Sequence, residues 1–332
     1  LEKITVEGEV LDASGQLVTD FTGIVNPTVK DSKVTVTCLK NSNKDDSPAF
    51  TFTDYPNTIF IGNDSVRNGK FSFTFTVPKD ISYSNLQGKM NLYAVDTESG
   101  NEAQGNFDNF IVGGTSDTAE TDTIGPEIRA LYLNDTTFVD GGQVNTTPYF
   151  VAELWDKSGV NITGSSVGHD MMLVIDESTV LSYNLNSYYE LLPGEDGTGI
   201  VKFPIPALEP GKHTAEFWVW DILNNSTVRT FTFEVVEGLK PFLFDVIATP
   251  GIAREQVTFH LMHNRPESRM RVGIMVYDLA GRQLWKHEES GTSGLFENYT
   301  VSWDLTSGGA RMRPGVYIYR AAISTDNSKD AT

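Results

Sequence analysis

The chain has 332 residues, a formal net charge of -19 at pH 7 and a pI near 4.6. A surface this acidic repels phosphate backbones and anionic lipid headgroups, which argues against nucleic acid and against peripheral membrane binding. Hydrophobic residues make up 39% of the chain, which is enough to build folded cores, yet no stretch approaches the ~18 apolar residues of a membrane-spanning helix. Because single cores stop growing near ~250–300 residues, the length predicts two or three domains.

Cys38 is the only cysteine, so the chain cannot form an internal disulfide. A eukaryotic secreted chain built of β-sandwiches usually carries cysteine pairs, which favours a cytosolic or a bacterial exported origin here. The residue pattern places Cys38 on the same face as Val34 and Val36, which predicts a small buried residue and not a nucleophile. The strand pattern begins directly at Leu1, and we expect the chain to be a piece of a longer protein.

Alternation of apolar and polar residues with a period of two dominates the chain. Phe71, Phe73 and Phe75 alternate with serine and threonine, as in a strand with one dry and one wet face. Near residues 215–220 both faces are apolar, which predicts a central strand. The same alternation recurs at 34–38, 231–235 and 257–261. No run has helical spacing, so the sequence predicts an all-β protein of antiparallel, Ig-like β-sandwich modules.

Turn residues and two linkers divide this pattern. Asn68-Gly69 is a strong hairpin signal, because both residues tolerate positive φ. A small, polar and acidic segment at 115–123 and a shorter break near 237–240 separate three stretches of strand pattern. We therefore expect three tandem modules: module one at 1–114, module two at 124–237 and module three at 240–325. Residues 326–332 are expected to form a polar tail.

Side chains that carry chemistry are scattered, and no pattern amounts to a catalytic centre. His260 and His263 fall on opposite faces of one strand, so they are poorly placed to share a metal, and exposed imidazoles are the simpler interpretation. His169 stands beside Asp170, but sequence neighbours on a strand diverge, which favours a structural hydrogen bond for His169. The five tryptophans are expected to pack in cores and not to form a sugar-binding platform.

Calcium is the more serious cofactor candidate, because it takes six to eight oxygen ligands and several aspartates lie near predicted loops. These are Asp135, Asp140, Asp156, Asp170 and Asp176. No D-x-D-x-D-G loop with a closing glutamate occurs, so incidental loop carboxylates are the simpler interpretation. The sequence therefore predicts no obligatory cofactor and leaves calcium open as an alternative.

Several segments go beyond generic β patterning. Residues 122–128, Trp155-Asp156, Gly168-His169-Asp170 and Trp220-Asp221 resemble the module that follows the catalytic domain in the gingipain-related sortases of the bacterial type IX secretion system. Module one is also similar to that family, so the resemblance spans essentially the whole chain. The last module resembles the C-terminal sorting domains of proteins exported by this system, on Tyr277, Asp278, Gly281, Trp303, Asp304, Pro314, Gly315 and Tyr317.

The resemblance implies that the chain is the non-catalytic C-terminal half of such a sortase. The cysteine peptidase domain would lie upstream of Leu1, and Cys38 does not match its active-site segment. The full protein would be an exported endopeptidase and transpeptidase at the bacterial cell surface and outer membrane, which cleaves sorting domains from cargo and attaches the cargo to surface lipopolysaccharide. Module three would dock through the eight residues above onto an outer-membrane β-barrel shuttle protein of the PorV type.

Two other functions stay open at this point. The chain could be an adhesin or carbohydrate-binding fragment of another exported protein, which predicts an exposed aromatic row and measurable glycan affinity. It could also be a metal-assisted hydrolase that uses His169 with nearby aspartates, which predicts a partner within ~3 Å of His169 in a cleft.

Overall fold

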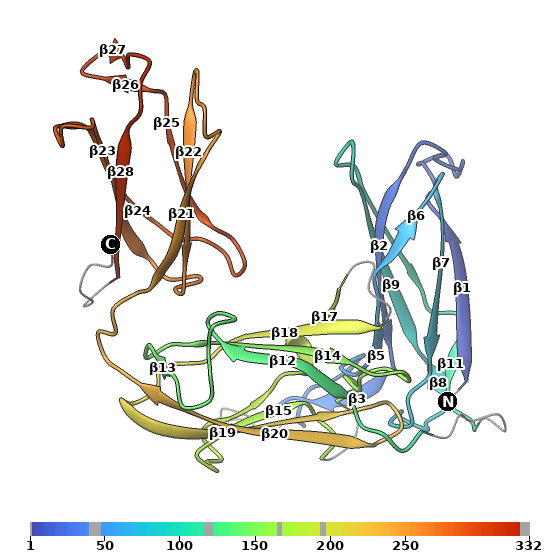
Figure 1. The fold of residues 1–332 in the computed structure, drawn as a ribbon. Coiled ribbons are helices and arrows are strands. Elements are labelled where there is room, and N and C mark those ends of the chain that lie inside the picture. Colours follow the sequence, from blue (N-terminus) through green and yellow to red (C-terminus); the bar gives the residue numbers. More distant parts are fainter. Residues whose placement is uncertain (1, 40–47, 116–121, 165–167, 193–196, 326–332) are drawn as a thin grey trace. The chain divides into compact units, whose positions relative to one another are not determined.

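The computed structural model describes residues 2–39, 48–115, 122–164, 168–192 and 197–325 (Figure 1). Within these ranges the chain is built of strands, and the one helical segment is a 3-10 turn at Asn186–Tyr188. The all-β prediction is therefore confirmed. No helix in the described part of the chain is long and apolar enough to cross a membrane. Most of the predicted linker and the whole predicted tail lie outside the described residues.

The chain divides into two compact units. One comprises residues 1–131, 151–203 and 214–231, and the other comprises residues 132–150, 204–213 and 232–332. This division passes within strands of module two, so the boundaries of the three modules stay a prediction. Every strand pairing in the described residues nevertheless falls inside one of three stretches, at 3–112, 127–235 and 243–325.

Module one packs a strand pair against a larger sheet (Figure 1). Its strands are β1 (Lys3–Glu9), β2 (Gly23–Lys30), β3 (Val34–Thr37), β4 (Thr51–Asp54), β5 (Thr58–Ile61), β6 (Asp64–Val66), β7 (Lys70–Thr76), β8 (Leu86–Gln87), β9 (Lys89–Asp96), β10 (Glu102–Phe107) and β11 (Ile111–Val112). The pair β1-β7 faces the sheet β10-β9-β2-β5, in which β6 also pairs with β2. Two further short pairs are β8 with β11 and β3 with β4. Asn68 and Gly69 have positive φ between β6 and β7, which confirms the predicted hairpin turn.

Module two is built of two larger sheets. Its strands are β12 (Glu127–Leu133), β13 (Gln143–Val144), β14 (Tyr149–Trp155), β15 (Met172–Ile175), β16 (Ser182–Asn184), β17 (Tyr189–Leu191), β18 (Thr198–Pro204), β19 (Gly211–Trp220) and β20 (Ser226–Val235). The sheet orders are β12-β14-β18-β17 and β13-β20-β19-β15-β16. β13 and β20 pair in parallel, so the prediction of antiparallel sheets misses this short pair. β19 is central in its sheet, as its apolar faces predict.

Module three has two three-stranded sheets and a short hairpin. Its strands are β21 (Leu243–Thr249), β22 (Val257–His263), β23 (Met270–Tyr277), β24 (Gln283–Gly291), β25 (Tyr299–Trp303), β26 (Thr306–Ser307), β27 (Ala310–Arg311) and β28 (Ile318–Thr325). The sheet orders are β21-β22-β25 and β24-β23-β28, with β26 paired to β27. The inward residues of both sheets form one core that includes Phe259, Leu261 and Ile274.

The period-two prediction is confirmed in the cores but is wrong at Cys38. Phe71, Phe73 and Phe75 are buried, whereas Cys38 is exposed. Among the described residues, β3 pairs only with β4, whose four residues are all exposed, and β3 ends one residue before Cys38. Val34 and Val36 are half-buried, so the alternation along β3 does not extend to burial at Cys38.

The core of module three gives a first prediction. Leu261 is fully buried, so Leu261→Ala should leave a cavity and lower the free energy of unfolding by about 2–5 kcal/mol. The matched control is Leu279→Ala at an exposed turn of the same module, which should change stability by less than about 0.5 kcal/mol. Chemical denaturation followed by tryptophan fluorescence measures both, and equal effects would contradict this account of the core.

Candidate functional site

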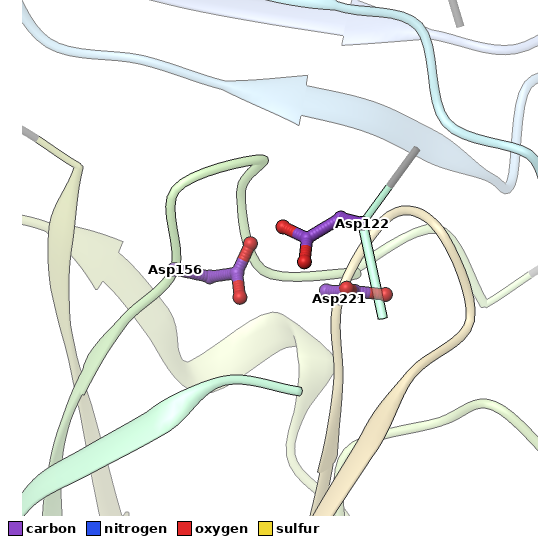
Figure 2. A group of neighbouring side chains, drawn as sticks. All are labelled: Asp122, Asp156 and Asp221. Carbon is purple, nitrogen blue, oxygen red and sulfur yellow. The ribbon is translucent and has the colours of Figure 1, made fainter. Parts of the chain in front are cut away.

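Three aspartates meet at one end of module two (Figure 2). Asp156 directly follows β14, and Asp221 directly follows β19, so each of the two sheets delivers one carboxylate after a Trp-Asp step. Asp122 comes from the segment before β12. One carboxylate oxygen from each residue lies within 4.8 Å of those of the other two. All three residues belong to the first compact unit.

Backbone amides hold the carboxylates of this cluster in place. Asp156 Oδ1 accepts hydrogen bonds from the amides of Ser158 and Gly159, at 2.7 and 3.0 Å. Asp221 Oδ1 accepts from the amides of Leu223 and Asn225, at 2.9 and 2.7 Å. Each aspartate thus closes the turn that follows its own strand, which fixes where the carboxylate points.

Further hydrogen bonds tie Asp122 to both turns. Asp122 Oδ2 accepts from the Ser158 hydroxyl at 2.9 Å, and the Asp122 backbone carbonyl accepts from Asn225 Nδ2 at 3.0 Å. The segment before β12 is therefore fastened to the turns after β14 and β19, and the three acids are brought together by contacts between residues distant in sequence.

Burial disfavours the ionised form of the carboxyl groups in this cluster. Asp156 is 6% exposed and Asp221 is fully buried. The pKa of Asp156 is raised to about 6, mainly by burial and to a smaller extent by the charges of Asp221 and Asp122, against the opposing effect of its two amide donors. Burial likewise raises the pKa of Asp221. In contrast, the Ile124 amide and the Ser158 hydroxyl lower the pKa of Asp122.

An oxygen-only donor set of this kind suits a hard cation. Carboxylates are ligands that Ca²⁺ and Mg²⁺ prefer, and no Lys or Arg of the described residues forms a salt bridge with these three acids. A divalent cation between them would offset the mutual repulsion and the burial of the charges. Among the described residues, Asp122, Asp156 and Asp221 accordingly form a group that could hold a metal.

The sequence identified only one of these three acids. Asp156 was among the predicted calcium candidates, and the other four candidates lie in separate turns. Three of those four accept hydrogen bonds from threonines: Asp135 from Thr137, Asp140 from Thr232 and Asp176 from Thr214. The signal for Asp221 was the second Trp-Asp step after a strand, which repeats the pattern at Asp156.

His169 forms a hydrogen bond with the buried carboxylate of Asp80, which the structural interpretation predicts and which also meets the ~3 Å distance that the hydrolase alternative requires. Its Nδ1 lies 2.7 Å from Asp80 Oδ2, and its ring packs on Trp220 with centroids 4.5 Å apart. Asp80 also accepts from Asn161 Nδ2, so the carboxylate belongs to a buried network. Asp170 turns away and accepts from Asn186, which supports the prediction that it does not orient His169.

The histidines of β22 differ in part from the prediction of exposed imidazoles. His260 is half-buried and its Nε2 lies 2.7 Å from Thr249 Oγ1. His263 is also half-buried, and burial lowers its pKa to about 4, helped by the charge of Arg265. The difference arises because His263 continues the inward row of Phe259 and Leu261 on β22, whereas His260 contacts Thr249 of the neighbouring β21.

The eight predicted docking residues gather at one end of module three. Tyr277 ends β23 and pairs with Ile318 at the start of β28, while Trp303 ends β25 and stacks on Trp285 near the start of β24, with centroids 4.7 Å apart. β21 begins at Leu243 at the opposite end of its sheet. The chain therefore enters the module at one end, and the predicted docking residues lie at the other, which we call the distal end.

Individual docking residues differ in how accessible they are. Trp303 is 5% exposed and belongs to the core, so it cannot itself contact a partner. Asp278 accepts hydrogen bonds from the amides of residues 280 and 282. Asp304 accepts one from the amide of residue 306, so both carboxylates close turns. The exposed members of the set are Gly281, Asp304, Pro314 and Gly315. The docking role of the set stays a prediction.

Comparison with known proteins gives one informative relative. No protein-family model matches the chain, and no curated protein matches it. Among solved structures, the chain is similar to dimeric latent PorU from Porphyromonas gingivalis, with 38% identity over 100% of this chain and 31% of that chain, and a TM-score of 0.41.

Two further solved structures are distant. The N-terminal Ig1-2 module of the Drosophila receptor protein tyrosine phosphatase DLAR is 11% identical, over 53% of this chain and 89% of that chain, with a TM-score of 0.25. The FN1-FN3 domains of chicken CNTN1 are 8% identical, over 99% of this chain and 95% of that chain, with a TM-score of 0.21. Neither superposition supports an argument about function.

The relationship to PorU rests on sequence identity and not on the superposition. The aligned region makes up 31% of the PorU chain. The chain is thus related to a region of PorU.

The acidic cluster predicts that calcium stabilises the protein. Binding to the folded state alone adds about 2.7 kcal/mol at a calcium concentration of 100 times Kd, which should raise Tm by several degrees relative to EDTA. Asp156→Asn should reduce this response strongly while keeping the oxygen that accepts from Ser158 and Gly159. The control is Asp135→Asn, which lies outside the cluster and should respond like wild type. Identical melting of wild type in calcium and EDTA would exclude the site.

The raised pKa of Asp156 predicts a pH dependence in EDTA. Its folded-state pKa of about 6 lies above the ordinary value of 3.8, so the folded state binds this proton more tightly than the unfolded state. This stabilisation amounts to at most about 2–3 kcal/mol. It is present at pH 4 and is lost as the pH rises through 6. Denaturation at several pH values should show wild type losing stability relative to Asp156→Asn over this range. Parallel curves for the two proteins would contradict the assignment.

Proposed function

We propose that this chain is the non-catalytic C-terminal half of a type IX secretion sortase. The observation that carries the proposal is the 38% identity to PorU along the full length of the chain. The whole protein would cleave sorting domains from exported cargo and attach the cargo to surface lipopolysaccharide. That chemistry would belong to a cysteine peptidase domain elsewhere in the protein, because the segment around Cys38 does not match the active-site motif of such a domain.

Modules one and two would brace the peptidase domain. Hydrogen bonds join the two modules within the first compact unit: the Lys79 amide donates to the Ile222 carbonyl at 2.9 Å, and Asn224 Nδ2 donates to Asp80 Oδ1 at 2.9 Å. Calcium would be a structural ion in this account. It would fix the segment before β12 to the turns that follow Asp156 and Asp221.

Module three would dock the sortase at the outer membrane, on a β-barrel shuttle protein of the PorV type. Its distal end exposes apolar side chains that the core does not need, among them Leu279, Val316 and Ile318. β28 adds an edge, because it pairs only with β23 among the described residues. Exposed apolar groups beside an unpaired strand edge suit association with another protein. The full protein would thereby reside at the bacterial cell surface.

The docking proposal is tested in the full-length sortase. Deletion of residues 240–325 should abolish capture of the barrel partner in a pull-down, and Val316→Asp should weaken capture at least tenfold, because a charge is introduced into an exposed apolar contact. Val180→Asp is the matched control, since Val180 is exposed in a turn of module two. Undiminished capture by both the deletion and Val316→Asp would refute the docking role.

A further inference from the structure

The outer face of the sheet in module one carries an ordered array of polar side chains. Strand register places Gln104, Tyr93 and Asn26 side by side on β10, β9 and β2. The next outward row consists of Asn106, Asn91 and Thr28. The opposite face of the same strands supplies core residues such as Val25, Met90 and Ala94. We call these six outward residues the amide face.

The amide face is hollowed. A depression of about 440 Å³ is lined by all six residues, together with Leu92 and Gly105 between the two rows. Neighbouring strands of a sheet lie about 4.8 Å apart, and outward residues along one strand are about 6.8 Å apart. The six side chains therefore form a grid with spacings comparable to the dimensions of a sugar ring.

The chemistry of the amide face is neutral and rich in hydrogen-bonding groups. Four of its six members are carboxamides, each of which offers two N–H donors and a carbonyl acceptor. No hydrogen bond found in the described residues engages the side chains of Asn26, Asn91, Gln104 or Asn106. The chain as a whole is 21% charged, yet no member of the grid carries a charge. Glu102 is the outward residue before Gln104 on β10, so a carboxylate borders the grid without lining the hollow.

An aromatic ring completes the array. Tyr93 stands in the middle of its row and is 41% exposed. Its hydroxyl hydrogen-bonds to Glu102, which raises the pKa of Tyr93 and limits where the ring can lie. A fixed, exposed ring among carboxamides gives an apolar surface surrounded by hydrogen-bonding groups. The five tryptophans do not offer this, because each is buried or half-buried.

We propose that the amide face binds a neutral oligosaccharide. Sugar hydroxyls are both donors and acceptors, so they match carboxamides, which are also both. The apolar C–H face of a sugar ring packs on an aromatic side chain such as Tyr93. Lys30 and Lys89 lie at the next outward positions beyond Thr28 and Asn91, outside the hollow. The ligand is therefore recognised by hydrogen bonds and ring packing, without an ion pair.

The test is a titration of the full chain with neutral hexasaccharides of glucose, mannose and galactose, followed by saturation-transfer NMR and calorimetry. At least one of these probes should bind, with an affinity that changes less than twofold between 50 and 500 mM NaCl. Tyr93→Ala and Gln104→Glu should each weaken binding at least tenfold. The first removes the ring, and the second replaces two donors by a charged acceptor at nearly the same volume.

Gln283→Glu is the matched control, because Gln283 is an exposed carboxamide on β24 of module three. This variant should bind like wild type, and circular dichroism should show all three variants folded. No binding of any probe at millimolar concentration would overturn the proposal. Equal binding by Gln104→Glu and wild type would also overturn it, as would binding that is lost at high salt or in Lys89→Ala, since such a ligand would be anionic.

Discussion

A β-strand assigns every second side chain to the core, and this constraint determines where the molecule can carry function. In β9, Met90 and Ala94 face inward and are buried, so only the alternate residues can meet a ligand. Inward positions must be apolar, because an unpaired polar group in the core costs about 1–3 kcal/mol. Chemistry is therefore restricted to outward rows and to the turns where strands end. The amide face is of the first kind, and the acidic cluster and the distal end are of the second.

The turns after strands tolerate buried charge because backbone amides are available there. A carboxylate that accepts two amide hydrogen bonds, as Asp156 does, recovers part of the solvation that it loses on burial. The recovery is incomplete, since the pKa of Asp156 is still raised to about 6. Three such groups close together leave excess negative potential at a fixed place. That excess separates this cluster from Asp135 and Asp304, which close similar turns outside the cluster.

The fold was largely predictable from the sequence, and the sites were not, for one physical reason. Alternation such as that of Phe71, Phe73 and Phe75 is local, so it is visible in the sequence. Which strand ends meet depends on sheet order, and nothing local indicates that Asp122, Asp156 and Asp221 come together. The same limit explains Cys38, because alternation predicts a face but not whether another sheet covers that face. His263 is the converse case, in which the inward row of β22 continues with a polar residue.

The three surfaces should behave as independent elements. Hydrogen bonds of Lys79 and Asp80 join module one to module two, but they involve no residue of the amide face, and strand pairing in the described residues never joins different modules. Substitutions that share no contacts usually have additive effects. A change in the amide face should therefore leave cation binding and docking unaltered, whereas a core substitution disturbs whatever its own module displays. Tandem sandwiches allow one chain to carry several separate candidate sites, because outward rows and the turns after strands are left free by the cores.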